Sequence, residues 1–313
     1  MGYLIEGQWQ EGDATEAAKD GRFQRAESAF RHTLGEGEFP EEEGRYHLYV
    51  SLACPWAHRT LIQRARRRLE GVIGLSVVHW RMREGGWSFR DGPGVLPDPV
   101  MQARFLHELY AKADPHYSGK ATVPVLWDRA TDRIVSNESS EILRMLDRAF
   151  GGSGELYPEA LRAEIDAVNE RVYRDVNNGV YRAGFAASQE AYEEAVAPLF
   201  EALDWLETRL SGQRYLMGDR LTEADIRLWT TLVRFDAVYV THFRCNLRRL
   251  VDYPHLWAYA RDLYAQPGFG ETTDFAHIKR HYFESHVRLN PGGIVPLGPI
   301  VDWDAPHGRD GMG

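Results

Sequence analysis

The sequence predicts an α/β domain followed by an all-helical domain. Between residues 45 and 150, strand-like and helix-like segments follow one another in the order β-α-β, a connecting segment, and then β-β-α. This order suits a small sheet whose strands run in both directions. A glycine-rich stretch, GGSGELYP at 151–158, marks a linker. Beyond the linker, apolar residues recur at steps of three and four, the spacing of one buried helix face.

Residues 1–44 are predicted to form an N-terminal extension. The segment is polar, acidic and rich in glycine, as in LGEGEFPEEEG at its end. It is therefore expected to be an extension rather than part of a core. It shows neither the basic and apolar stretches of an export signal nor the Ser or Thr of a myristoylation signal.

The α/β domain is expected to span residues 45–150. Alternating or β-branched runs predict its strands, and apolar periodicity predicts its helices. In chain order the segments are RYHLYVSL (strand), PWAHRTLIQRARRRL (helix), VIGLSVVHW (strand), TVPVLWD and RIVS (strands) and ESSEILRMLDRAF (helix). The connecting segment 81–121 is unusually long for a loop, and loops of that length inside a compact domain are often functional.

The helical domain is expected to span residues 158–287. Its longest pattern, AYEEAVAPLFEALDWLETRL, contains Pro198, which is expected to kink or divide the helix. The apolar face of that pattern consists of Tyr192, Val196, Leu199, Leu203, Leu206 and Leu210.

The segment LTEADIRLWTTLV predicts a strongly specified helix start. Thr222 and Asp225 can each cap the backbone N–H of the other, as in a capping box, while Leu221 and Ile226 occupy the positions of a hydrophobic staple. Asp225 is therefore expected to be structural rather than catalytic. The tail 288–313 is rich in Pro and Gly, which excludes a regular helix, and is expected to lie against the body through Trp303.

Composition excludes several classes of function. Apolar residues make up 43% of the 313 residues without a run long enough to span a membrane, so we expect a soluble globular protein. The formal net charge of −9 argues against wholesale nucleic-acid binding. The basic cluster Arg66 to Arg68 is expected to be a solvated helix face, or else a positive field for an anionic substrate near Cys54. Two cysteines cannot form a disulfide framework, which indicates a reducing, cytoplasmic location.

Cys54 is the leading candidate for chemistry. It lies between a predicted strand and a helix that begins with Pro55, a residue that suits the first helical position. The positive end of the helix dipole favours a thiolate, which is the attacking species in thiol chemistry. The alternative is a buried, inert cysteine, since free cysteines are often buried.

Ala57 occupies the position at which a second cysteine would complete a Cys-X-X-Cys pair. The other cysteine, Cys245, belongs to the helical half and is expected to be an ordinary packed residue, the alternative being a distant resolving thiol. A lone reactive thiol needs an outside thiol to reset it, and the abundant cytosolic one is glutathione.

The Val123–Pro124 bond precedes a strand and is a candidate for a cis peptide bond. That geometry would leave the backbone N–H and C=O of Val123 available to pair with a peptide ligand, as an added strand would.

These features together resemble the glutathione transferases, which join a thioredoxin-like N-terminal domain to an all-helical C-terminal domain. Blocks such as SLACPWAHRT, ADPHYSGKATVPVLWD, NNGVYRAGFA, VRFDAVYVTHFRCN and IKRHYFESHVRLNPGGIVPLGP resemble the glutathionyl-hydroquinone reductases, the xi class of that family. The resemblance covers about residues 45–300 and implies a homodimer that uses glutathione as co-substrate.

The resemblance also implies a glutathione site. Glu138 and Ser139 would hold the γ-glutamyl end, and Val123 would supply backbone pairing. Trp87 and Lys120 match positions that contact the tripeptide; the family more often has Arg at the latter, so Lys120 would pair with a carboxylate less rigidly. The alternatives are a core aromatic at Trp87 and a plain helix start at Glu138 and Ser139.

Cys54 would be the nucleophile, and Tyr181 and Tyr282 would line an aromatic-substrate site beside it, unless both tyrosines are core aromatics. No metal is expected, although His277 and His281 lie four apart on a predicted helix, because no further ligand pattern supports one.

The resemblance implies glutathione-dependent reduction of glutathionyl-hydroquinones through a Cys54–glutathione mixed disulfide, with release of oxidised glutathione. The nearest alternative is a general thioltransferase or dehydroascorbate reductase, as in omega-class relatives. A non-catalytic interaction module is a third possibility, in which Cys54 and the tyrosines would be dispensable.

Overall fold

The computed structural model describes residues 2–12 and 21–312. By their contacts these residues form two compact units. Unit 1 comprises residues 2–12, 26–153 and 272–295, and unit 2 comprises residues 21–25, 154–271 and 296–312. The sequence predicts domains as continuous ranges along the chain, whereas these units are defined by contacts. The predicted domain ranges therefore stay a prediction.

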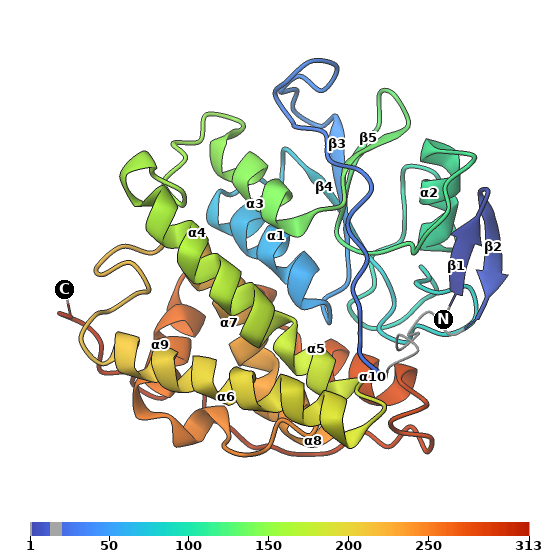
Figure 1. The fold of residues 1–313 in the computed structure, drawn as a ribbon. Helices are drawn as coiled ribbons and strands as arrows, with labels where there is room; N and C mark the ends of the chain where they lie inside the picture. The colour runs from blue at the N-terminus through green and yellow to red at the C-terminus, as the bar shows by residue number, and fades with distance from the viewer. Residues whose placement is uncertain (1, 13–20, 313) are drawn as a thin grey trace. The chain divides into compact units, whose positions relative to one another are not determined.

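Unit 1 is an α/β unit (Figure 1). Along the chain its strands and helices are β1 (Gly2–Ile5), β2 (Gln8–Glu11), β3 (Tyr46–Val50), α1 (Pro55–Arg66), β4 (Gly74–Val77), α2 (Leu106–Ala113), β5 (Val125–Asp128), β6 (Arg133–Ser136), α3 (Ser139–Arg148) and α10 (Phe275–Ser285). The strands and helices predicted between residues 45 and 150 are therefore all present, β6 with the predicted bounds and the others with shorter ones.

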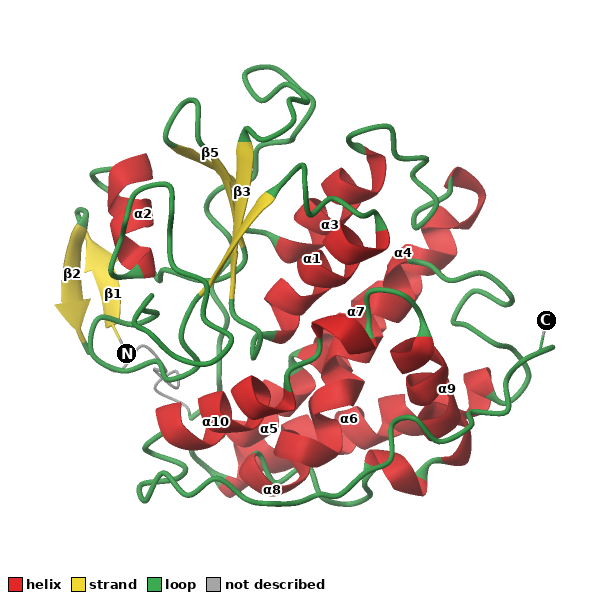
Figure 2. Cartoon of the chain, turned by 180° about the vertical axis from the view of Figure 1, so that it is seen from behind, coloured by secondary structure: helices red, strands yellow, loops and turns green. Residues whose placement is uncertain are grey.

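The central sheet has the strand order β4-β3-β5-β6. Strands β3 and β4 are parallel, which requires a crossover, and helix α1 supplies it. Strand β5 runs antiparallel to both β3 and β6. The predicted small sheet of mixed direction is thus confirmed. Helices α1 and α3 lie on one side of the sheet and α2 on the other, as both views show (Figures 1 and 2).

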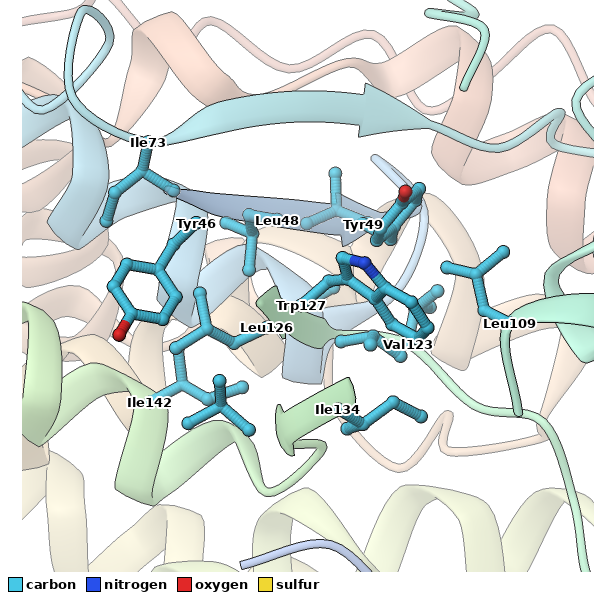
Figure 3. Close-up of a cluster of buried hydrophobic side chains, with 14 of the residues drawn as sticks. Tyr46, Leu48, Tyr49, Ile73, Leu109, Val123, Leu126, Trp127, Ile134 and Ile142 are labelled. Atoms are coloured by element: carbon cyan, nitrogen blue, oxygen red, sulfur yellow. The ribbon is translucent and has the colours of Figure 1, made fainter. Parts of the chain in front are cut away.

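The core of unit 1 occupies both faces of this sheet. Every residue of β3 and β5 is buried, because helices cover both faces. In Figure 3, Leu109 of α2 points toward Trp127, and Ile142 of α3 lies next to Leu126. These four side chains are all fully buried.

Two sequence-based expectations for unit 1 are wrong. The segment 81–121 contains helix α2 and is not one long loop. The N-terminal segment also contributes to the core, since Leu4, Leu34 and Phe39 belong to the main hydrophobic cluster. The backbone of this segment pairs with strand β6, for example from His32 N–H to Val135 O at 2.9 Å. These contacts join residues roughly a hundred positions apart, so local sequence patterns do not predict them.

Unit 2 is helical in the part of the chain that the structure describes (Figure 2). Its α-helices are α4 (Arg162–Arg171), α5 (Gly179–Gly184), α6 (Gln189–Leu210), α7 (Glu223–Arg234), α8 (Val240–His242) and α9 (Pro254–Ala265), with π-helical segments at Val172–Asn177 and Phe235–Tyr239 and 3-10 turns at Glu159–Leu161 and Leu250–Asp252. A further 3-10 turn spans Gly270–Thr272. Pro198 lies inside α6 and does not divide the helix. The predicted kink at Pro198 stays a prediction.

The predicted helix start at Thr222 is confirmed. Helix α7 begins with a capping box in which the Thr222 N–H donates to Asp225 Oδ2 at 2.8 Å. Asp225 Oδ1 accepts from the Leu216 N–H and from the Tyr259 hydroxyl, both at 2.8 Å. Burial raises the pKa of Asp225, although these hydrogen bonds oppose the rise. The carboxyl group thus joins three segments of unit 2.

The C-terminal tail is only partly packed. The Trp303 ring lies 4.9 Å from that of Trp257, as expected, and Arg309 is 2% exposed and donates to the Leu210 carbonyl. Leu297 and Ile300 are nearly fully exposed, so the expectation that the apolar residues before Trp303 are packed is wrong for these two.

Candidate functional site

Cys54 is the N-cap residue of α1, and Pro55 is the first residue of the helix, as predicted. The turn after β3 places it there, with the Cys54 N–H donating to Ser51 O at 3.1 Å. The thiol is half-buried, and its Sγ lies 3.6 Å from Val123 O. The first-turn N–H groups and the positive end of the helix dipole therefore act on the thiol of a residue that is only partly buried.

The two cysteines have different environments. Cys245 is fully buried, and burial raises the pKa of its thiol far above the usual range. The Cys245 Sγ lies 3.7 Å from Phe243 O in unit 2. Cys245 is therefore the packed, inert residue that the sequence predicts, and the sealed environment considered for Cys54 is found at Cys245 instead.

Val123 lies directly beside the Cys54 sulfur. The Val123–Pro124 peptide bond is cis, as predicted. The Val123 carbonyl accepts from the Cys54 thiol, and within residues 2–12 and 21–312 no hydrogen bond to the Val123 backbone N–H is present. A backbone donor and a backbone acceptor thus lie next to the candidate nucleophile.

Glu138 and Ser139 lie at the start of helix α3. Glu138 is the N-cap, and its carboxylate accepts from Ser140 N–H at 3.0 Å and from Ser28 Oγ at 3.0 Å. Burial alone would raise the pKa of Glu138, but these hydrogen bonds and the charge of Arg59 outweigh it and lower that pKa below its usual value. Glu138 is therefore ionised at neutral pH, as a partner for an ammonium group must be.

Trp87 and Lys120 differ in exposure. Trp87 is buried and stacks on His281 of α10, with ring centroids 4.8 Å apart. Lys120 is exposed, and its carbonyl accepts from the Tyr117 hydroxyl at 3.1 Å. The structure places both in unit 1 with Cys54, and their predicted contacts with glutathione stay a prediction.

The two tyrosines belong to different units. Tyr282 lies on α10 of unit 1 and is 1% exposed, with its ring 5.4 Å from that of His286. Tyr181 lies on α5 of unit 2, where the Arg25 guanidinium lies 5.0 Å above its ring. Tyr181 is half-buried in a cluster of aromatic rings that includes Phe243.

The two histidines of α10 are bonded to backbone. His277 Nε2 lies 2.6 Å from Pro93 O, and His281 Nδ1 lies 2.7 Å from Trp80 O. Among the described residues there is no group of three or more His, Cys, Asp or Glu side chains placed to hold a metal ion. None of the helices in the described ranges is both long enough and apolar enough to span a membrane.

Comparison with known proteins gives the family. The glutathione S-transferase N-terminal domain model matches residues 53–149, and the C-terminal domain model matches residues 189–262. The chain is 55% identical to glutathionyl-hydroquinone reductase YqjG of Escherichia coli over 99% of each protein. It is 52% identical to glutathionyl-hydroquinone reductase PcpF of Sphingobium chlorophenolicum over 96% of each. The chain belongs to the glutathione transferase family.

Solved structures add the class, and the chain belongs to the xi class of this family. The xi-class glutathione S-transferase of Phanerochaete chrysosporium is 53% identical and matches with a TM-score of 0.90, over 93% of this chain and 96% of that one. A glutathione-bound structure of the Escherichia coli protein is 56% identical, with a TM-score of 0.88 over 90% and 96%. The predicted fold, a thioredoxin-like domain and a helical domain, is thereby confirmed.

Sequence reasoning did not single out Arg59 in this xi-class chain. Arg59 lies on α1 and is 1% exposed, with its guanidinium 4.4 Å above the Trp56 ring. It donates to Ser139 Oγ at 3.4 Å. Because arginine has donors only, the Ser139 hydroxyl accepts this bond and can donate its own proton elsewhere. Arginine is usually exposed, so a helix pattern gives no signal that this one is buried.

Replacing Arg59 with methionine is expected to raise KM for glutathione about tenfold while kcat changes little, because Arg59 orients Ser139 and adds positive charge at the start of α3. Steady-state kinetics with varied glutathione measures both constants, and Arg59→Lys should recover part of the loss. Arg64→Met is the matched control, since Arg64 is also buried on α1 but donates to the Ile73 carbonyl. Equal KM increases in both methionine variants would contradict the role of Arg59.

Proposed function

We propose that this xi-class chain is a glutathionyl-hydroquinone reductase. It removes glutathione from a glutathionyl-hydroquinone, releases the hydroquinone and produces oxidised glutathione. The observation that carries the proposal is the identity of 55% and 52%, over nearly the whole chain, to two proteins that bear this name. The position of Cys54 at the start of α1 supports it, because the reaction needs an accessible thiolate.

In the first step the Cys54 thiolate attacks the sulfur of the glutathionyl group. A sulfur–sulfur bond forms between Cys54 and glutathione, and the bond between that sulfur and the aromatic carbon breaks. The aromatic carbon keeps the electron pair and takes up a proton, so the hydroquinone is released. The start of α1 stabilises the thiolate before the attack.

The glutathione moiety is held by the groups around Cys54. Val123 pairs with the tripeptide backbone through its N–H and C=O. Glu138 takes the γ-glutamyl ammonium, and the Ser139 hydroxyl and the N–H groups of α3 take the carboxylate. Trp87 and Lys120 complete the contacts.

Tyr282, with Tyr181, lines the aromatic-substrate site and supplies the proton to the ring carbon, or stabilises the keto tautomer of the ring, through its hydroxyl. The family resemblance of both segments supports this assignment.

In the second step a second glutathione thiolate attacks the mixed disulfide, releasing oxidised glutathione and the Cys54 thiolate. Ala57 supports this route, because a cysteine there would form an internal disulfide in place of the glutathione attack. The buried Cys245 is not suited to the resolving role either.

We further propose a cytoplasmic location and a homodimer. Both cysteines are free thiols, which suits a reducing compartment. The homodimer is supported by the family resemblance, and size-exclusion chromatography with light scattering measures it directly.

Intact mass spectrometry tests the reaction. One equivalent of a glutathionyl-hydroquinone, without free glutathione, should add the mass of a single glutathione to the protein and release one equivalent of hydroquinone. Peptide mapping should find the adduct on Cys54, and added glutathione should remove it.

Three outcomes would contradict the proposal, each in favour of a different conclusion. Absence of hydroquinone release would show that the bond between the glutathionyl sulfur and the aromatic carbon is not broken. Faster turnover of dehydroascorbate or of a mixed disulfide than of the glutathionyl-hydroquinone would favour a general thioltransferase. Absence of any adduct or turnover with these substrates would favour an interaction module.

A further inference from the structure

Unit 1 contains a cleft that the proposed reaction does not use. It has a volume of about 900 Å³. It is lined by residues of the segment 81–105 other than Trp87, by strand β2 and by the first turn of α2. This volume is within the range of small-molecule sites. None of the residues proposed for glutathione or for the hydroquinone lines it.

Four arginines line this cleft, although the chain as a whole carries a formal charge of −9. Within the described ranges, none of the four guanidinium groups is at ion-pair distance from a carboxylate. The Arg83 guanidinium donates to the main-chain Glu284 O at 2.7 Å, and that of Arg90 to His79 Nδ1 at 3.1 Å. The other two arginines of the cleft, Arg81 and Arg104, are both exposed.

Three of these arginines lie close enough to repel one another. Burial, and then the positive charge of Arg81, lower the pKa of Arg90. The negative charge of Glu284 opposes this shift, and the charge of Arg83 adds to it. The arrangement is therefore a concentrated positive field that an anion would relieve.

Two of the three acidic residues that line the cleft already accept hydrogen bonds from neighbouring groups. The buried Asp98 carboxylate accepts from the Tyr49 hydroxyl at 2.8 Å and from the N–H groups of its own loop, such as Ala103 at 3.0 Å. Glu11 Oε1 accepts from the Trp9 indole and from the Gly85 N–H. Glu84, which is exposed, is the third acidic residue.

A column of flat rings forms the other wall. The His107 ring stacks on Trp9 with centroids 4.4 Å apart and on Phe105 at 5.3 Å, with interplanar angles of 15° and 13°. All three rings are half-buried. Burial lowers the pKa of His107, so the imidazole is neutral at pH 7.

The loop opposite is shaped to admit these rings. Gly85 and Gly86 both have φ of +74°. A Cβ at Gly85 would lie 2.3 Å from Phe105, and one at Gly86 would lie 2.9 Å from Trp9. Only glycine fits at these two positions. The loop that carries the arginines can therefore lie directly against the rings, so both line the same cleft.

We propose that this cleft binds a planar aromatic phosphate of the nucleoside monophosphate class. The phosphate lies among Arg81, Arg83 and Arg90, and the base stacks on the ring column. One guanidinium suffices for a carboxylate, whereas several suit a phosphate monoester, which carries a charge of about −1.5 to −2 at pH 7. Stacked aromatic side chains accept purine rings as a further layer.

Isothermal titration of the full chain with AMP, adenosine and inorganic phosphate tests the proposal. We expect one AMP to bind per chain. Adenosine and phosphate should each bind at least about tenfold more weakly, because adenosine lacks the phosphate group and phosphate lacks the base. The double variant Arg81→Gln/Arg90→Gln should weaken AMP binding by about a hundredfold. Arg148→Gln, an exposed arginine at the end of α3, is the matched control and should bind as the wild type does.

Cys54→Ser separates this proposal from the reductase proposal, because it should bind AMP with unchanged affinity. Equal affinity of AMP in the double variant and the wild type would overturn the cleft assignment. Phosphate binding as tightly as AMP would overturn the role of the rings, and loss of AMP binding in Cys54→Ser would assign the ligand to the reaction site instead.

Discussion

Replacing Cys54 with serine is expected to reduce turnover of a glutathionyl-hydroquinone by about three to four orders of magnitude, as loss of a covalent nucleophile does in other enzymes. A serine hydroxyl is not ionised at neutral pH and does not form the mixed disulfide. No other thiol takes over, because Cys245 is fully buried. The measurement is kcat/KM under saturating glutathione, together with intact mass to show that no adduct forms.

Two controls isolate the chemical role of the thiol. Cys54→Ser should bind glutathione within about twofold of the wild type, since serine keeps the size of the side chain and the Val123 and Glu138 contacts do not depend on sulfur. Cys245→Ser should keep its activity and lose about 1 to 2 kcal/mol of stability, because it places a hydroxyl in a fully buried position. A Cys54→Ser enzyme with more than a tenth of wild-type activity would contradict the mechanism.

The sequence predicts this site where local chemistry decides the structure. Cys54 followed by Pro55 specifies a helix start within a few residues, and the structure places the cysteine at the N-cap. The Val123–Pro124 bond is likewise a local feature, and it is cis as expected. The capping box at Thr222 depends on four consecutive residues and forms as predicted.

The parts that sequence reasoning missed depend on contacts between distant segments. Leu4 pairs through its backbone with Gly119, so an apparently polar extension contributes a core residue. Ser28 reaches Glu138 from the same extension, 110 positions away. Arg59 is buried because Trp56 and Ser139 surround its guanidinium, and no periodic pattern encodes a buried charge.

Sequence reasoning missed helix α2 for a second reason. Its eight residues, Leu106–Ala113, are too few for apolar periodicity to distinguish a helix from a loop. What stabilises it is tertiary, since Leu106, Leu109 and Tyr110 are fully buried in the core of unit 1. A short helix of this kind forms because its apolar face has a partner, which the sequence of the helix alone does not show.

Replacing Asp225 with alanine is expected to destabilise the protein by about 4 kcal/mol, the largest effect on stability that we predict. Its carboxylate is fully buried and accepts from four donors, which are the Leu216 N–H, the Thr222 N–H and hydroxyl, and the Tyr259 hydroxyl. Alanine leaves these donors buried without an acceptor, and each one then costs its desolvation energy. Urea unfolding followed by circular dichroism measures the change.

A comparison of three variants separates the buried network from capping in general. Asp225→Asn should cost about half as much, because its carbonyl keeps one acceptor while its amide faces a donor. Asp252→Ala removes a similar N3 aspartate, but that side chain is 37% exposed and should cost less than about 1 kcal/mol. Equal losses for Asp225→Ala and Asp252→Ala would show that the cap alone matters. The expected ranking instead assigns the stability to one carboxyl group that ties the start of α7 to Leu216 and Tyr259.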